Sequence, residues 1–133
     1  MRKVLIDTSA YSRLLRGSEE VLNALGGADI VHMSVFVLAE LYAGFKGGSK
    51  EARNKDLLDR FLRRPTVRTV PATRETAEVF AGIKHALRKA GTPLPINDVW
   101  VAAHAVETGS VLVTFDAHFK QIGGLRLWNV RRP

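Results

Sequence analysis

The stretch PINDVWVAAHAVETGSVLVTFD, residues 95–116, decides the fold. It opens with a proline-rich approach and continues as a long apolar run that carries one carboxylate, Asp98, near its start. The segment 110–116 that follows, SVLVTFD, is the clearest strand of the sequence. A helix that leads directly into an apolar strand is typical of a parallel sheet, whose strands are joined by crossover helices.

The rest of the chain repeats this alternation of strands and helices. Apolar runs predict further strands at 3–7, 29–33, 66–70 and 125–129. Helical spacing, caps and glycine stops predict helices at 8–17, 21–27, 35–45, 49–64 and 73–90, and a short turn at 117–122. The helix at 35–45 is apolar nearly all round, so we expect it to be buried. We therefore predict an α/β fold: one three-layer domain, residues 1–133, with helices on both faces of a parallel sheet.

Composition limits the classes of protein to consider. The chain has 133 residues and no cysteine, which excludes disulfides, thiolate zinc sites and cysteine nucleophiles. Neither a signal peptide nor an apolar stretch of about 18 residues is present, so we expect a cytoplasmic protein. The net charge of +7 indicates a polyanionic partner such as nucleic acid, and eight of the basic residues lie between Lys50 and Arg74.

Four acids are placed where a ligand of a parallel sheet would lie. Asp7 and Asp116 each follow a predicted strand, at the carboxyl edge where such sheets bind ligands. Asp98 begins a helix that runs back toward the strand at 110–116, so we expect it at the same edge. Glu40 has apolar sequence neighbours, and burial of an unpaired carboxylate there would be costly.

Each acid also has a structural explanation. Asp7, Asp98 and Asp116 could cap helices, and Glu40 could pair with an arginine. Together, however, four carboxylates on one edge repel one another unless a cation holds them. Oxygen ligands without histidine or cysteine favour Mg²⁺, with Mn²⁺ as the alternative, and such a metal can activate water for attack on a phosphodiester.

Four segments in order resemble the motifs of the PIN-domain ribonucleases, specifically the VapC toxins of toxin–antitoxin pairs. They are LIDTSAYSRLL, SVFVLAELYAG, PINDVWVAAHAVETG and VLVTFDAHFKQIGGLRL, and they cover essentially the whole chain. The resemblance implies a parallel five-stranded sheet between helices and an acidic site for Mg²⁺ or Mn²⁺. It places the family's four acids on Asp7, Glu40, Asp98 and Asp116, with Asp7 and Asp98 as the firmest metal ligands.

The resemblance also implies partners and a role for nearby residues. It predicts a homodimer, and a VapB-like antitoxin that lays a segment into the groove by the active site. Thr114 lies beside the acids in the motif, where its hydroxyl could bind a carboxylate or phosphate. Arg53, Arg60 and Arg64 of the basic helix are candidate RNA contacts, although a run of charges can equally be a solvated face. His104 does not share a helical face with Asp98, which argues against a catalytic role.

We therefore predict a Mg²⁺-dependent endoribonuclease toxin that cleaves RNA with a metal-activated water. Two other classes stay open. One is a non-catalytic RNA-binding or regulatory module with a structural metal, which turnover would distinguish from an enzyme. The other is a receiver-like phosphotransferase with Asp7 as nucleophile. Against it, the sequence DTS has no second acid two residues on, and no lysine ends the strand at 110–116.

Overall fold

A four-stranded parallel sheet forms the centre of the molecule. In this computed structural model, which describes residues 1–128, the strands are β1 (Lys3–Ile6), β2 (Ile30–Ser34), β3 (Val67–Val70) and β4 (Val111–Val113). They lie in the order β3-β2-β1-β4, and every pair is parallel. The chain therefore moves outward from β1 to β3 and returns to the other side of β1 for β4.

The expected fifth strand is reduced to a single bridge. Leu127 forms one parallel bridge with Leu112, and the Trp128 amide donates to the Leu112 carbonyl. Residue 129, the last of the predicted strand, lies outside the described residues. The five-stranded sheet is therefore wrong in this detail, because residues 125–128 make a single bridge with β4.

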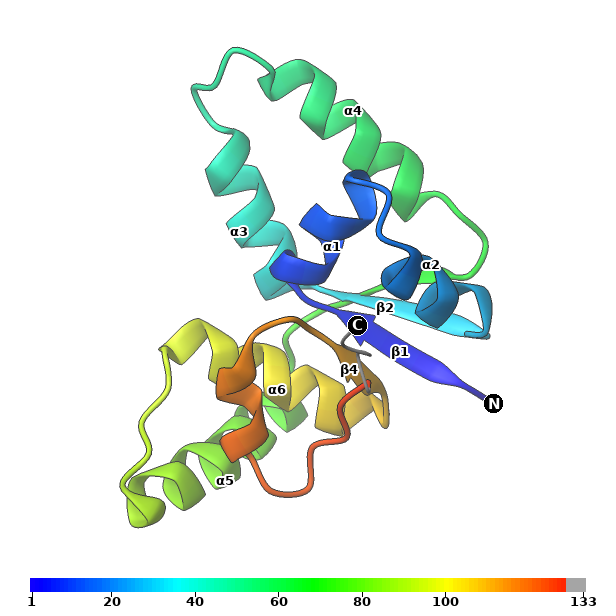
Figure 1. Cartoon of the computed structure of the whole chain (residues 1–133). Coiled ribbons are helices and arrows are strands. Elements are labelled where there is room, and N and C mark those ends of the chain that lie inside the picture. The colour runs from blue at the N-terminus through cyan, green and yellow to red at the C-terminus, as the bar shows by residue number, and fades with distance from the viewer. Residues whose placement is uncertain (129–133) are drawn as a thin grey trace.

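Helices cover both faces of the sheet, as predicted. The helices α1 (Thr8–Leu15), α2 (Glu19–Gly26), α3 (Val35–Phe45) and α4 (Glu51–Leu62) lie on one side. The other side carries α5 (Arg74–Ala90), α6 (Ile96–Thr108) and the 3₁₀ turn η1 (Ala117–Gln121) (Figure 1). The strands and helices predicted from periodicity are thus present, with the final strand as the exception.

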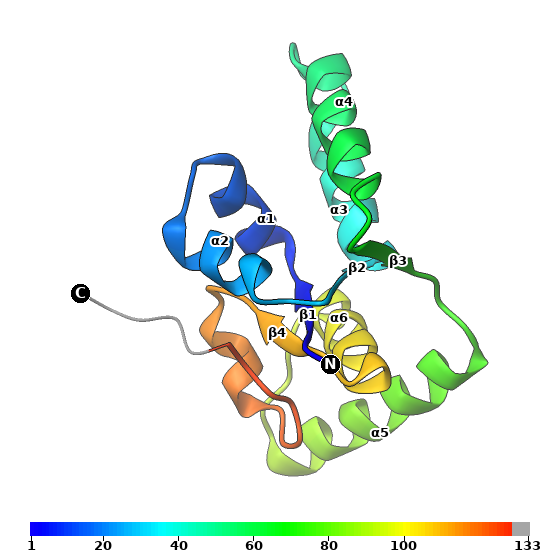
Figure 2. The same ribbon diagram turned by 90° about the vertical axis from the view of Figure 1, so that its right-hand side faces the viewer.

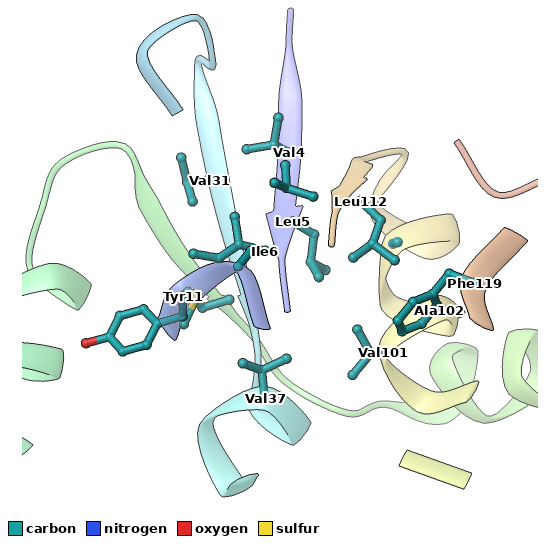
Figure 3. Packing of buried hydrophobic residues seen from close by; sticks show 14 of the residues in the cluster. Val4, Leu5, Ile6, Tyr11, Val31, Val37, Val101, Ala102, Leu112 and Phe119 are labelled. Carbon is teal, nitrogen blue, oxygen red and sulfur yellow. The ribbon is translucent and has the colours of Figure 1, made fainter. Parts of the chain in front are cut away.

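The core lies between the sheet and these two helical layers. Leu5 and Ile6 are adjacent in β1 and fully buried, and they point to opposite faces, as a strand requires. Ile6 faces Tyr11 of α1, whereas Leu5 faces Ala102 of α6 and the Phe119 ring (Figure 3). The α/β architecture therefore depends on a strand that is apolar on both sides.

The helix α3 is less buried than its composition predicted. Only Val37, Leu38 and Leu41 are buried, while Val35 and Tyr42 remain more than a third exposed. Figure 2 shows the reason: α3 and α4 form a hairpin that extends away from the sheet, so that one side of α3 has no neighbour in this chain. Among residues 1–128, no helix has the length and apolar character needed to cross a membrane.

Candidate active site

The strand order places a binding site at the ends of β1 and β4. Connections leave these neighbouring strands toward opposite faces, so the ends of β1 and β4 form the switch point at which open parallel sheets bind ligands. Asp7 directly follows β1, and Thr114 to Asp116 directly follow β4. Residues more than a hundred positions apart in sequence therefore meet.

Asp7 is the most rigidly held of the acids. It is the N-cap of α1, and its Oδ1 accepts hydrogen bonds from the Ala10 amide at 2.9 Å and the Ser9 hydroxyl at 2.7 Å. Its Oδ2 accepts a bond of 2.5 Å from the Thr114 hydroxyl. The residue is 7% exposed, and burial raises the pKa of its carboxyl although these three bonds oppose the shift.

Thr114 connects the two strand ends. Its hydroxyl donates to Asp7 and accepts from the Asp116 amide at 3.0 Å. A second link runs from the Phe115 amide to the Ser9 hydroxyl oxygen at 3.1 Å, and Ser9 in turn donates to Asp7. The predicted contact of Thr114 with a carboxylate is present, and this hydroxyl donor is committed to Asp7.

Asp98 and Glu40 complete the acidic group from two helices. Asp98 lies in the first turn of α6, and burial raises the pKa of its carboxyl, helped by the negative charges of Asp116 and Glu40. Asp116 also raises the pKa of Asp7. The structure therefore brings all four predicted acids into one electrostatic neighbourhood.

Glu40 departs from its predicted environment. The apolar neighbours in its sequence suggested a buried side chain, but Glu40 is exposed and accepts a 2.8 Å hydrogen bond from the Thr8 hydroxyl. The reason is geometric, because Leu38 and Leu41 are buried in the core while Glu40 projects from the exposed part of α3 toward Thr8 at the start of α1. Glu40 therefore belongs to the rim of the site.

His118 is a residue of the site that the sequence pattern did not indicate. Its Nδ1 lies 2.9 Å from an oxygen of Asp116 and 3.6 Å from an oxygen of Asp98. Asp116 caps η1 and accepts the His118 amide, which turns the imidazole back onto the acids. The sequence shows that His118 follows Asp116 by two residues. It does not show the 3₁₀ turn that brings the two side chains together.

The donor set fits a divalent cation. One ligand atom each from Asp98, Asp116 and His118 lie within 4.8 Å of one another. The charge of Asp116 helps to raise the pKa of Asp7, and Asp116 and Glu40 help to raise that of Asp98, so a positive ion among these groups would relieve repulsion. Oxygen ligands suit Mg²⁺ and Mn²⁺, and an imidazole nitrogen adds a ligand that transition metals accept more readily.

His104, by contrast, belongs to the core. It is fully buried, and its ring nitrogens lie 2.7 Å from the Ser34 hydroxyl oxygen and 3.1 Å from the Pro71 carbonyl oxygen. The carbonyl can only accept, so Nε2 carries a hydrogen and Nδ1 accepts from Ser34 in the neutral ring. Its contacts with Ser34 and Pro71 give it a structural role between α6, β2 and β3.

The three arginines considered as RNA contacts lie in α4 or just after it: Arg53 and Arg60 belong to the helix, and Arg64 follows its C-cap. Arg60 pairs with Asp56 at 2.9 Å, and the Arg64 guanidinium lies 5.9 Å from the centroid of the Phe61 ring. Arg53 is exposed. Within residues 1–128, none of the three forms an ion pair or hydrogen bond with the acids, so the structure does not bring them into the cluster.

Comparisons with known proteins agree with this architecture. A model of the PIN domain family matches residues 4–125. The ribonuclease VapC2 of Haemophilus influenzae is 30% identical over 132 residues, which are 97% of this chain and 98% of that relative.

Two solved toxin–antitoxin structures are similar in fold. A DNA-bound VapBC from Salmonella typhimurium superimposes with a TM-score of 0.85 at 24% identity, covering 96% of this chain and 98% of the other. VapBC2 from Rickettsia felis, bound to a fragment of promoter DNA, gives a TM-score of 0.82 at 24% identity with the same coverage. At this identity the likeness shows the fold, whereas the chemistry of the switch point depends on the geometry of this chain's own acids.

Proposed function

Because this chain belongs to the PIN-domain family, within its VapC group, we propose that it is a metal-dependent endoribonuclease and the toxin of a toxin–antitoxin pair. The observation that carries the proposal is the meeting of Asp7, Glu40, Asp98 and Asp116 at the β1–β4 switch point. A protein of charge +7 with a cluster of acids offers attraction for RNA and a place to bind a cation.

We assign the acids distinct tasks. Asp98 and Asp116, with His118 beside them, would hold the divalent ion, Mg²⁺ or Mn²⁺, and Asp7 would complete the set from the end of β1. When bound, the ion polarises a phosphate and lowers the pKa of a water molecule. Thr114 and Ser9 fix the Asp7 carboxylate through hydrogen bonds, so we class them as positioning residues. Glu40, on the rim, adds negative charge near Asp98.

The first test is cleavage of total RNA by the purified chain with Mg²⁺, with Mn²⁺ and with excess EDTA. We expect discrete fragments that require the metal and that disappear in Asp98→Asn and Asp7→Asn, because both variants remove a charged ligand while nearly keeping the shape. The matched control is Asp59→Asn, which removes an exposed acid from α4.

Two results would oppose this proposal. Full activity of Asp98→Asn would remove that residue from the site. Metal binding without cleavage of any RNA would favour a non-catalytic RNA-binding module.

We also propose a VapB-like antitoxin and a homodimer as partners. The similar structures are of DNA-bound VapBC from Salmonella typhimurium and of VapBC2 from Rickettsia felis bound to promoter DNA. This chain exposes the apolar side chains of Val35 and Tyr42 on α3 and Leu15 on α1. Sedimentation of the isolated chain tests the dimer, and co-purification with the product of the neighbouring reading frame tests the antitoxin.

A further inference from the structure

Arg13 of α1 lies beside the acids but is not bound to any of them. Its guanidinium carbon is 4.1 Å from the centroid of the Phe115 ring, within the range of a cation–π contact. Phe115 lies between Thr114 and Asp116, and its amide donates to Ser9, which donates to Asp7. The aromatic platform under Arg13 is therefore part of the hydrogen-bonded frame of the active site.

The stacking leaves the hydrogen-bonding groups of Arg13 available. A guanidinium that lies over a ring uses its flat face, whereas its N–H donors point outward along its edges. Within residues 1–128, Arg13 forms no ion pair with a carboxylate, whereas Arg60 of α4 and Arg63, the C-cap of that helix, are paired with Asp56 and Asp59. Arg13 is thus oriented, exposed and not neutralised.

A second arginine and a shallow cleft adjoin it. Arg13, Arg16, Gly17 and Ser18 line an open cleft of about 380 Å³ where α1 ends and α2 begins. Gly17 has a φ of 83°, a left-handed conformation that glycine adopts without strain and that turns the chain sharply between the two helices. The α2 amino end adds little by itself, because Glu19 and Glu20 occupy its first turn, so the arginines must supply the attraction.

We propose that Arg13 and Arg16 form a phosphate-binding site that holds the RNA strand next to the bond to be cut. The proposal rests on the proposed ribonuclease function and assigns its strand-binding residues. Arg13 stacks on Phe115, which lies between Thr114 and Asp116 in the chain, so the site adjoins the acids and can bind a phosphate near the scissile one. Guanidinium forks match phosphate oxygens, which makes a phosphate the fitting ligand.

This site and the basic helix α4 make different predictions. At α4, RNA would have to compete with Asp56 and Asp59 for Arg60 and Arg63, although not for Arg53, whereas neither Arg13 nor Arg16 has a carboxylate partner among residues 1–128. If the field of the whole protein alone attracts RNA, removal of any one exposed arginine should have the same effect. If the proposed site exists, removal of Arg13 or Arg16 should weaken binding more.

The experiment is binding of a fluorescently labelled single-stranded RNA to the full chain in EDTA, over a range of salt concentrations. EDTA prevents cleavage, so affinity is measured separately from activity. We expect the double variant Arg13→Ala, Arg16→Ala to bind about tenfold or more weakly at low salt. The slope of log affinity against log salt should fall by about 1.4, because each phosphate of a single strand that a protein neutralises contributes about 0.7.

Matched variants distinguish the site from charge alone. Arg60→Ala removes one charge from α4, as Arg16→Ala removes one from the proposed site, and should change affinity and slope much less than Arg16→Ala does. Arg13→Lys keeps the charge but removes the flat stacking group, so its salt slope should be retained while its affinity falls. Arg16→Ala alone leaves the stacking of Arg13 on Phe115 in place, which guards against a variant that merely fails to fold; the melting temperature checks each protein.

The outcomes separate this proposal from the proposed function. Equal losses in Arg60→Ala and in the Arg13 and Arg16 variants, or an unchanged salt slope in the double variant, would overturn the site. If the expected losses occur and Asp98-dependent cleavage is intact, both proposals stand. If binding depends on Arg13 and Arg16 but no metal supports cleavage, the phosphate site stands and the nuclease does not.

Discussion

Single hydroxyl groups hold the acids of this site in position. Thr114 supplies one bond to the Asp7 carboxylate and receives another from the Asp116 amide, so one side chain fixes the spacing of two acids from different strands. Groups that orient metal ligands without binding the ion themselves commonly affect metal affinity or activity by about 10 to 100-fold. Thr114 is the best candidate for such a role here.

The first prediction concerns this hydroxyl. Thr114→Val keeps the side-chain volume but removes the donor to Asp7, so we expect cleavage and Mn²⁺ affinity to fall by about 10 to 100-fold. Thr114→Ser keeps the hydroxyl and should stay close to the wild type. Metal affinity is measured by calorimetry, separately from cleavage, and equal affinities in Thr114→Val and the wild type would show that Thr114 does not position the ligands.

A second prediction at this scale uses the buried His104. Burial lowers the pKa of this ring in the folded state, against an ordinary value of 6.5, so the unfolded chain binds the proton more readily. The stabilising contribution of the neutral ring is therefore complete above pH 6.5 and is lost as the pH falls below it. His32 has a pKa lowered in the same direction by its own burial and by Lys3 and Arg68, so it adds to the effect.

Urea unfolding between pH 5 and 8 tests this dependence. The wild type should lose stability more steeply below pH 6.5 than His104→Gln, which cannot titrate at this position. His85→Gln, at an exposed position on α5, is the control and should follow the wild type. Parallel curves for His104→Gln and the wild type would contradict the assignment.

At the scale of the elements, an aromatic column joins three helices. The Trp100 ring of α6 stacks on Phe80 of α5 at 3.8 Å between centroids, and on Phe36 of α3 at 4.9 Å. Trp100 is half-buried between the two phenylalanines. This column ties the α5–α6 layer to the first turn of α3, the helix that carries Glu40.

We expect Trp100→Ala to lower the free energy of unfolding by about 2 kcal/mol, less than the 3 to 5 kcal/mol typical of fully buried tryptophan. Trp100→Phe keeps an aromatic ring and should cost about 1 kcal/mol or less. Denaturant unfolding measures both values. A neutral Trp100→Ala variant would mean that the stacking contributes nothing to the stability of the helical layers.

Sequence patterns predicted some features of the helices and strands well and others poorly. The strands at 3–7 and 110–116 and the cap at Asp7 were predictable, because hydrophobic periodicity and capping chemistry are local. The extent to which α3 is buried was not predictable, because an apolar helix sequence does not reveal which side of the helix has a neighbour in the same chain. For the same reason the exposure of Glu40, the single bridge at Leu127 and the approach of His118 to Asp98 required the structure.

On the scale of the whole molecule, charge and metal act together. Basic residues exceed acids by seven, yet four acids are concentrated at one switch point. A cation there should stabilise the folded chain by mass action, by about 2.7 kcal/mol when its concentration is a hundredfold above the dissociation constant. This increase in stability requires the folded metal site. Its measurement therefore detects metal binding even if no RNA is cleaved.

The prediction is a rise in melting temperature with Mn²⁺ that EDTA reverses. Asp98→Asn should reduce the rise, because one of the charged groups near the ion is removed, while the exposed control Asp59→Asn should keep it in full. An equal rise in Asp98→Asn and the wild type would place the bound ion elsewhere on the molecule.

The hydrogen bond between Thr114 and Asp7 spans 107 positions of sequence, and this separation has a consequence during synthesis. At about 5 to 20 residues per second, a ribosome completes Asp116 roughly 5 to 20 seconds after Asp7. Until β4 has emerged and paired with β1, the nascent chain carries the first acids without the ones that complete them. With the proposed function, we expect an unfinished copy to leave the RNA of its own ribosome uncut. A chain that is truncated before β4 should likewise be unable to cleave RNA.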